Sequence, residues 1–375
     1  MKKEILKIGF KPLSLVNKFI KKNEKLIFFY SNLGFRDNVR AFYEYLIAQN
    51  YNEEYQIVVS INDVEDYKEQ APKNVTFVNN RQGISYFLRA KYGFYCFGKY
   101  PIKPSGQQMI VNLWHGTPLK KIGNLEKGME KTDYNFFTVV AASAPMYKPI
   151  MAKIFGCRED QVVVVGNPRN DELFAEDKNA DKMIAEEGQK VILWMPTYRE
   201  YDEDYVVSLV KKDRLKHLNK RLAEDNCKLI IKLHPLQTAS VKGMEYSNIQ
   251  FATQKDLDKK KLSVYALMRR ADGLITDYSS AYFDYMLLNR PIAFTVDDIE
   301  EYGKKRGFIF DNPYPYMPGM KLTSFEELEQ YITDVIEGKD VYAAERERVN
   351  MEVNSYNDGN SSRRVEELVF GRRKG

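Results

Sequence analysis

Histidine and cysteine are scarce in this chain. Its 375 residues include three of each, and only two tryptophans. The cysteines, Cys96, Cys157 and Cys227, are scattered and odd in number, so the sequence predicts neither a disulfide framework nor a CxxC metal site. A reducing, cytoplasmic environment is therefore expected. Because histidine titrates near neutral pH, the positions of the three histidines become informative.

Several longer patterns are also missing. No apolar run approaches the roughly 18–20 residues that a membrane span needs, and nothing resembles a signal peptide with its cleavage site. The absence of Walker A and GxGxxG sequences argues against a P-loop nucleotidase and a typical dinucleotide enzyme. The acidic triplet 202–204 lies in an acidic run and is interpreted as a solvated loop. No metal or other cofactor is predicted, and Mg²⁺ is left open.

The residues that are present indicate an α/β protein of two domains. Hydrophobic residues make up 44% of the chain and aromatic residues 13%, which is ample for packed cores. Short apolar runs alternate with segments of helical periodicity, a pattern that predicts parallel sheets built from βαβ units. The runs expected to form strands are 26–30, 56–61, 75–78, 92–97, 109–113, 136–142, 162–165, 191–195, 229–233, 249–252, 273–276 and 292–296.

The predicted domain boundaries follow from these series of runs. A polar stretch at 175–190 separates the first seven runs from the last five, which predicts Rossmann-like domains over 26–180 and 181–375. The end of the second domain is expected to be helical. Ser324-x-x-Glu327 is a capping box that opens a helix to about residue 337. Further helices are expected over 343–351 and after Ser362.

Basic residues are concentrated in a separate N-terminal segment, residues 1–25. This segment carries eight lysines against two glutamates, or +6, whereas the whole chain has a net charge of +5. Ile, Leu and Phe side chains are interspersed with the lysines, and Pro12 is expected to break the segment. The pattern is typical of contact with an anionic membrane surface, and a solvated helix packed on the body is the alternative. Nucleic-acid binding is not expected, because no basic stripe extends into the rest of the chain.

The densest polar motif is Trp114–Pro118, with Lys120 shortly after it. It follows an apolar run, and the carboxyl ends of strands are where open α/β sheets bind ligands. His115 could accept a proton, Gly116 lets the backbone approach a ligand closely, and Lys120 adds positive charge. A histidine that merely ends a strand is the alternative. The clustering favours a site that includes Thr117 as well.

His234 occupies the same kind of position in the second half of the chain, between an apolar run and Pro235. A structural histidine before a Pro-fixed turn is the alternative to a functional one. A further constellation over 273–285 combines a strand, a polar turn and the start of a helix. Free N–H groups at such a helix start, with hydroxyls beside them, favour a diphosphate site formed by Asp277, Ser279 and Ser280. Simple helix capping by these residues is the alternative.

Three further loops are rich in polar and turn-forming residues. Their arginines could contact phosphate oxygens or could bond loop carbonyls. The candidate substrate-binding residues in these loops are Asn167, Arg169, Asp171, Thr197, Arg199, Arg306 and Asp311.

Taken in order, these motifs resemble those of the CDP-glycerol:poly(glycerophosphate) glycerophosphotransferase family, the teichoic acid primases and polymerases of Gram-positive bacteria. Each element is weak alone, but six in the right order are specific. The matching elements are Trp114–Gly123, Gly166–Asp171, Pro196–Arg199, Lys232–Pro235, Thr276–Tyr285 and Arg306–Asp311 with Pro318-Gly319.

The resemblance implies a GT-B-like fold, in which two Rossmann-like domains with parallel sheets face a cleft. It implies transfer of an alditol phosphate from CDP-glycerol or CDP-ribitol to a hydroxyl of a lipid-linked saccharide or polymer acceptor, with release of CMP. The expected location is the cytoplasmic face of the plasma membrane, as a peripheral protein.

The family's two histidines fall on His115 and His234. His115 is expected to accept the acceptor's proton, and His234 to offset charge on the leaving CMP. A GT-B glycosyltransferase that uses a nucleotide sugar is the closest alternative, and a non-enzymatic nucleotide- or polyanion-binding scaffold on the membrane is a more distant one.

Overall fold

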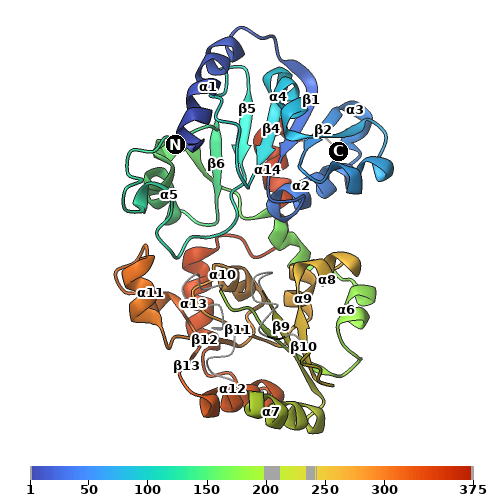
Figure 1. The fold of residues 1–375 in the computed structure, drawn as a ribbon, viewed down its shortest axis with the longest axis vertical. Coiled ribbons are helices and arrows are strands. Elements are labelled where there is room, and N and C mark those ends of the chain that lie inside the picture. The colour runs from blue at the N-terminus through green and yellow to red at the C-terminus, as the bar shows by residue number, and fades with distance from the viewer. Residues whose placement is uncertain (1, 198–211, 234–240, 242, 373–375) are drawn as a thin grey trace. The chain divides into compact units, whose positions relative to one another are not determined.

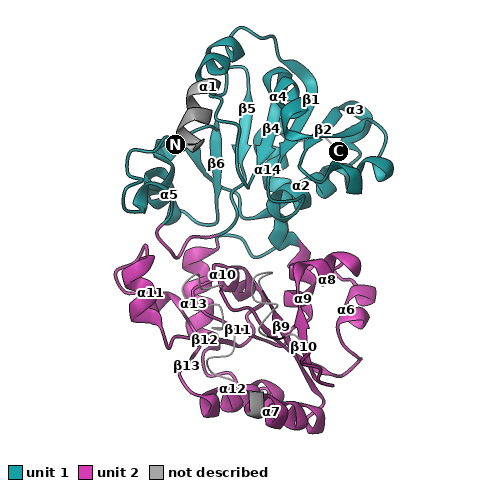
Figure 2. Ribbon diagram, viewed as in Figure 1, with its two compact units in different colours: residues 1–116, 122–171, 355–375 teal, residues 117–121, 172–354 magenta. Residues whose placement is uncertain are grey.

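The computed structural model describes residues 2–197, 212–233, 241 and 243–372, and the chain divides into two compact units. Unit 1 contains residues 1–116, 122–171 and 355–375, and unit 2 contains residues 117–121 and 172–354 (Figure 2). In each unit, helices connect the strands of a parallel sheet (Figure 1). The predicted α/β class with two parallel-sheet domains is therefore confirmed.

The described part of unit 1 holds a seven-stranded sheet in the order β3-β2-β1-β4-β5-β6-β7. Its strands are β1 (Asn23–Tyr30), β2 (Gln56–Ser60), β3 (Val75–Val78), β4 (Ala90–Tyr95), β5 (Met109–Asn112), β6 (Val139–Ala142) and β7 (Val162–Val164). Its helices are α1 (Lys2–Asn17), α2 (Asp37–Ala48), α3 (Tyr51–Glu54), α4 (Asn80–Arg89), α5 (Tyr147–Phe155) and α14 (Ser361–Phe370). Both faces of the central strands are covered, which explains why they read as continuous apolar runs.

The described part of unit 2 holds a six-stranded sheet in the order β10-β9-β8-β11-β12-β13. Its strands are β8 (Lys190–Trp194), β9 (Cys227–Lys232), β10 (Ile249–Ala252), β11 (Gly273–Thr276), β12 (Ile292–Thr295) and β13 (Met320–Leu322). Its helices are α6 (Lys178–Ile184), α7 (Lys212–Glu224), α8 (Gln254–Lys259), α9 (Val264–Arg270), α10 (Ala281–Tyr285), α11 (Ile299–Lys305), α12 (Phe325–Glu337) and α13 (Ala343–Val353).

All twelve predicted strands are present, and one further strand was missed. β13 has only three residues, too few to show a periodicity. Gly319, directly before it, allows its close approach to β12, because a Cβ at Gly319 would lie 2.1 Å from the carbonyl oxygen of Ile292. The capping box at α12 is confirmed, since the Ser324 hydroxyl accepts the N–H of Glu327 at 3.2 Å.

The unit boundaries differ from the predicted domains at both ends of the second domain. Residues 172–180 belong to unit 2, and α14 belongs to unit 1. Val365 lies in the unit 1 core, and the Glu366 carboxylate accepts a hydrogen bond from Tyr51 at 2.6 Å. An amphipathic helix shows which of its faces is apolar but not which core will bury that face, so the sequence did not assign α14 correctly.

The N-terminal segment forms α1, and Pro12 lies inside this helix rather than breaking it. The end of α1 is fixed to the body of unit 1, since the Asn17 amide donates to the Lys103 carbonyl at 2.9 Å and to Gln108 at 2.7 Å. Lys22 is buried, where its ammonium group donates to the carbonyls of Asn17 and Leu88. One of the eight lysines counted as surface charge is therefore internal.

Both sheets reverse their winding direction beside their first strand. In unit 1 the reversal falls between β1 and β4, and in unit 2 it falls between β8 and β11. Open α/β sheets bind ligands in the crevice outside the carboxyl ends of the strands at such a switch point. Each unit therefore has one position at which a ligand is expected.

Candidate active site

His115 lies close to the switch point of unit 1, three residues after the end of β5. Its imidazole contacts two aromatic rings. The ring centroid of Trp114 is 3.8 Å away, and the Phe97 ring is stacked on the imidazole at 5.1 Å with an interplanar angle of 15°. Phe97 follows β4, so neighbouring strands supply the histidine and its stacking partner.

The backbone around His115 is held by one side chain from α2 and one from the segment after β7. Asn38, in the first turn of α2, donates to the carbonyls of Leu113 at 3.1 Å and Trp114 at 2.9 Å. Arg169 donates through Nη1 to the carbonyl of His115 at 2.8 Å. The same Nη1 lies 2.7 Å from Oδ2 of Asp37, and both side chains of this ion pair are largely buried.

Two bulky or charged residues beside His115 adopt a left-handed backbone conformation. Trp114 has φ +53° and Asp37 has φ +62°. This region is unfavourable for residues with a Cβ, and such strain persists where the surrounding structure holds it. The hydrogen bonds from Asn38 and Arg169 provide that support. The loop is therefore held in one strained arrangement that orients the imidazole.

Burial lowers the pKa of His115 to about 4. The nearby Asp37 carboxylate raises the pKa and the Arg169 guanidinium lowers it, and both influences are smaller than that of burial. Since the value lies well below neutral pH, the imidazole is uncharged there. A neutral imidazole has a ring nitrogen free to accept a proton.

The Gly166–Asp171 loop combines support for His115 with attachment of α14. Asp171 accepts the backbone N–H groups of Ser361 and Ser362, each at 2.8 Å, through its two carboxylate oxygens. A Cβ on Gly166 would lie 2.5 Å from the Ser361 hydroxyl, so glycine is needed for this approach. Asn167 is buried, and its amide nitrogen has no hydrogen-bond partner among the described residues.

At the switch point of unit 2, Asp277 joins the loops that follow β8 and β11. Its fully buried carboxylate accepts the backbone N–H of Thr197 at 2.7 Å and also the Thr197 hydroxyl. Asp277 therefore fixes the Thr197 loop to the loop that follows β11. Ser279 accepts the N–H of Ala281 at 3.3 Å, whereas the Ser280 side chain makes no capping bond to α10.

The segment after Gly116 packs on the loop after α11, within unit 2. Lys120 forms an antiparallel bridge with Phe308, and the N–H of Lys121 donates to the carbonyl of Gly307 at 3.0 Å. The Lys120 ammonium lies 5.5 Å from the centroid of the Tyr302 ring. The predicted residues of these two segments have different exposures: Thr117 is buried, Lys120 is half-buried, and Arg306 and Asp311 are exposed.

Two predicted residues, His234 and Arg199, lie outside the described residues.

The sequence did not indicate Asp37, Asn38 and Phe97, which contact or support the His115 loop. The sequence contains only a weak indication that Asp37 and Asn38 belong to the site. Asp37 and Asn38 follow an apolar run and begin a helix, the same position that drew attention to Asp277.

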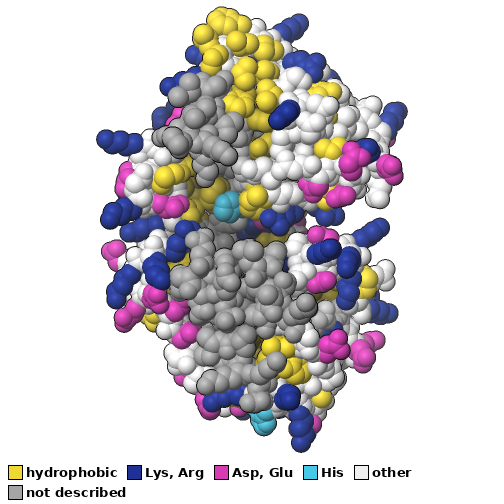
Figure 3. Space-filling view, viewed as in Figure 1, with side chains coloured by type: hydrophobic (Ala, Val, Ile, Leu, Met, Phe, Trp, Pro, Cys, Tyr) yellow, Lys and Arg dark blue, Asp and Glu magenta, His cyan; other side chains and the backbone are white. Residues whose placement is uncertain are grey.

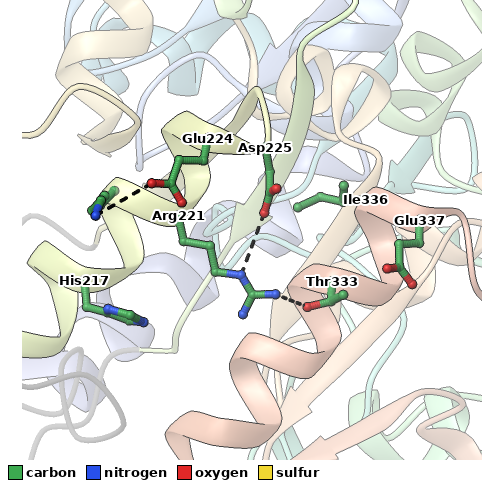
Figure 4. A pocket seen from close by; sticks show the side chains of 8 residues that line it. His217, Arg221, Glu224, Asp225, Thr333, Ile336 and Glu337 are labelled. Atoms are coloured by element: carbon green, nitrogen blue, oxygen red, sulfur yellow. Dashed lines mark hydrogen bonds and ion pairs between the residues drawn. The ribbon is translucent and has the colours of Figure 1, made fainter.

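One pocket of unit 2 lies away from this switch point. It has a volume of about 450 Å³ and lies between α7 and α12, beside the amino end of β9 (Figure 4). Its charged side chains pair with one another, as Arg221 does with Asp225 at 3.7 Å.

Among the described residues, no group of three or more His, Cys, Asp or Glu side chains is arranged to hold a metal ion. Within the same residues, none of the helices has the length and apolar character to cross a bilayer.

The two parallel-sheet units define a GT-B-like α/β fold. The sequence profile of the family described as CDP-Glycerol:Poly(glycerophosphate) glycerophosphotransferase matches residues 13–371, so the chain belongs to that family. The protein is accordingly a transferase of alditol phosphate groups in teichoic acid synthesis.

Similar proteins support this assignment. The chain is 30% identical over 329 residues to the teichoic acid poly(glycerol phosphate) polymerase of Bacillus spizizenii, covering 77% of this chain and 78% of that one. It is 27% identical to the teichoic acid glycerol-phosphate transferase of Staphylococcus aureus, covering 93% of each. The structure of the wall teichoic acid polymerase TagF superposes with a TM-score of 0.80 at 24% identity, over 97% of this chain and 93% of that one, and so shares the fold.

Proposed function

We propose that the protein transfers glycerol phosphate or ribitol phosphate from the CDP-alditol to a hydroxyl of a lipid-linked acceptor and releases CMP. The acceptor oxygen forms a bond to the β-phosphorus, and the bond between that phosphorus and the bridging oxygen breaks. The acceptor proton passes to the enzyme, and CMP leaves with the bridging oxygen. Family membership and the arrangement at His115 support this reaction.

In this proposal His115 is the general base. An uncharged imidazole beside a strand end can take the acceptor proton, and general bases contribute about 10²–10⁴-fold to rate. The observation that carries the assignment is the arrangement around the His115 loop. The backbone before His115 is strained, Arg169 bonds the His115 carbonyl, and the Trp114 and Phe97 rings contact the imidazole. The Gly116 backbone has φ +131°, so a side chain at this position would strain the turn that follows the base.

Unit 2 is proposed to bind the CDP-alditol. Thr197, Ser279 and Ser280 flank its switch point, and Asp277 holds two of the loops together. Hydroxyls and backbone N–H groups suit the oxygens of a diphosphate. His234, Arg199, Arg306 and Asp311 are proposed as further contacts on the basis of their motifs, while the two carboxylate oxygens of Asp171 already bond the start of α14.

The test is to incubate the protein with CDP-glycerol or CDP-ribitol, with and without a lipid-linked saccharide acceptor. Release of CMP and a mass increase of one alditol phosphate per transfer are expected with one of the donors. Mass spectrometry of the acceptor then also counts the units added. Transfer of sugar from a nucleotide sugar, with no reaction of either CDP-alditol, would contradict the proposal.

We further propose that unit 1 contacts an anionic membrane surface on the cytoplasmic side through the end of α1. Leu15, Val16 and Phe19 are exposed there, and Phe19 has 82% of its surface accessible. Hydrophobic side chains gather over this end of unit 1 in Figure 3. Exposed lysines accompany them at Lys18 and Lys21, a combination that suits an anionic bilayer interface.

The membrane proposal is tested by sedimentation with vesicles that contain anionic lipid. Replacing Leu15, Val16 and Phe19 by Ser should remove most binding, and the matched control is Val341→Ser, an exposed apolar residue of unit 2. Substitution is preferable to deletion, because removing residues 1–22 would also remove the buried bonds of Asn17 and Lys22. Binding should weaken with salt, since the Debye length falls from about 10 Å at 0.1 M to about 3 Å at 1 M. Unchanged binding by the triple variant would contradict the proposal.

A further inference from the structure

We propose that Arg36 and Phe97 form a phosphate-binding site beside His115, and that it takes the acceptor phosphate nearest the attacking hydroxyl. This inference rests on the proposed function, in which His115 accepts the proton of that hydroxyl. It specifies the chemistry of the acceptor: an alcohol that carries a phosphate ester a few bonds from the reacting oxygen.

The first observation is a stack of three side chains from three different loops. The guanidinium carbon of Arg36 lies 5.5 Å from the centroid of the Phe97 ring. The other stacking partner of Phe97 is the imidazole of His115, at 5.1 Å. A cation over an aromatic face within about 6 Å is attracted to the ring. Phe97 is therefore in contact with both a positive charge and the imidazole of the proposed base.

The second observation is that the two loops carrying Arg36 and Phe97 are locked together. The N–H of Asn32 donates to the carbonyl of Phe97 at 3.4 Å, and the Asn62 amide donates to the carbonyl of Asn32 at 2.9 Å. Gly98 has φ +67°, and a Cβ there would lie 2.5 Å from the Asn32 side chain. The close approach of these loops thus requires glycine at 98 and gives a rigid support for the stack.

The third observation is the position of these loops in the sheet. Arg36 follows β1 and Phe97 follows β4, the two strands between which the winding of unit 1 reverses. Ligands of open α/β sheets bind at this place. Arg36 also directly precedes α2, whose N-terminal end carries a partial positive charge of the same sign.

The charge of Arg36 is available for a ligand. The side chain is exposed, and within the described part of the chain it makes no ion pair. The neighbouring charges are already engaged: Asp37 pairs with Arg169 at 2.7 Å, and Arg40 pairs with Glu44 at 2.7 Å. A phosphate group suits an exposed guanidinium, because its oxygens can accept two parallel N–H bonds from the planar fork.

The test compares R36A and R36K with a matched control, R40A, which removes an arginine one helical turn away. Each enzyme is assayed with a phosphate-bearing acceptor and with the same acceptor lacking that phosphate. R36A should raise the KM for the phosphate-bearing acceptor about tenfold or more, because a charge-assisted hydrogen bond is lost. The KM for the CDP-alditol and the rate with the neutral acceptor should stay within about twofold of wild type, because neither compound bonds Arg36 in this proposal. R36K should recover part of the loss, and R40A should match wild type.

An equal loss with both acceptors would overturn the proposal, as would a rise in the KM for the CDP-alditol, which would assign Arg36 to the donor. Kinetics that match wild type would also overturn it, while leaving the proposed function intact. Titration with sn-glycerol 3-phosphate, followed by ligand-observed NMR, tests the site without turnover. Weaker binding to R36A than to R40A is expected, and equal binding would overturn the site even if the wild-type enzyme released no CMP.

Discussion

The switch points of the two units share a topology but differ in what surrounds them. In unit 1, an imidazole beside strained backbone contacts two aromatic rings and is uncharged at neutral pH. In unit 2, a buried carboxylate joins two loops whose hydroxyls and N–H groups lie near a short helix. The first arrangement fixes one reactive group, whereas the second presents several hydrogen-bonding groups. Under the proposed function, equivalent positions in two similar sheets serve chemistry in unit 1 and ligand binding in unit 2.

The largest expected effect is that of removing the imidazole of unit 1. His115→Ala should lower kcat by about 10²–10⁴-fold, because the acceptor proton loses its base. The dissociation constant for the CDP-alditol should remain near that of wild type, since the donor is assigned to unit 2. Single-turnover rates and donor titration measure the two quantities separately. The control is His217→Ala, an exposed histidine of α7. Retention of more than about a tenth of the wild-type rate would remove His115 from the role of base.

The corresponding change in unit 2 should act on binding. Asp277→Ala leaves the Thr197 N–H without its acceptor and frees the Thr197 loop, so the KM for the CDP-alditol should rise about tenfold, with a smaller fall in kcat. Asp284→Ala is the matched control, because it also removes a buried carboxylate, one that bonds Tyr265 at 3.0 Å. If both variants lose stability but neither changes the donor KM, Asp277 has a purely structural role.

A smaller effect is expected from the serines at α10. Ser280→Ala should weaken CDP-alditol binding a few-fold while leaving the thermal midpoint unchanged, because the Ser280 side chain makes no capping bond. Ser279→Ala should also lower stability, since its hydroxyl accepts the Ala281 N–H and a lost cap costs about 1 kcal/mol. Calorimetric titration of the folded variants measures the affinity. Affinity equal to wild type in both variants would reduce the serines to helix-start residues.

A last expectation concerns stability and pH rather than activity. Burial holds the pKa of His115 near 4, below the value of about 6.5 that is usual in an unfolded chain. Between these two pH values the unfolded state binds more protons, so the free energy of unfolding should fall as the pH is lowered through this window. His115→Gln should remove that part of the dependence. Thermal unfolding at pH 7 and pH 4.5 compares the two proteins, and parallel losses would show that the imidazole is not held uncharged.

The sequence alone determined the fold class and most of the local structure. Parallel strands buried on both faces appear as continuous apolar runs, so twelve strands could be read directly. The capping box at Ser324 and the position of His115 after a strand were equally local signals. Each depends on residues a few positions apart, which is why a single sequence was sufficient.

Only the tertiary structure decided which distant residues meet. Asp171 and Asp277 were both predicted to bind substrate, and the structure shows that Asp171 bonds the start of α14 and that Asp277 bonds the Thr197 loop, contacts that the sequence did not reveal. The support of His115 by Asn38 and Arg169 joins residues that are far apart along the chain. Carboxylates and amides can satisfy many partners equally well, so their chemistry does not specify a contact. The packing of strands and helices brings one partner within hydrogen-bonding distance and excludes the others.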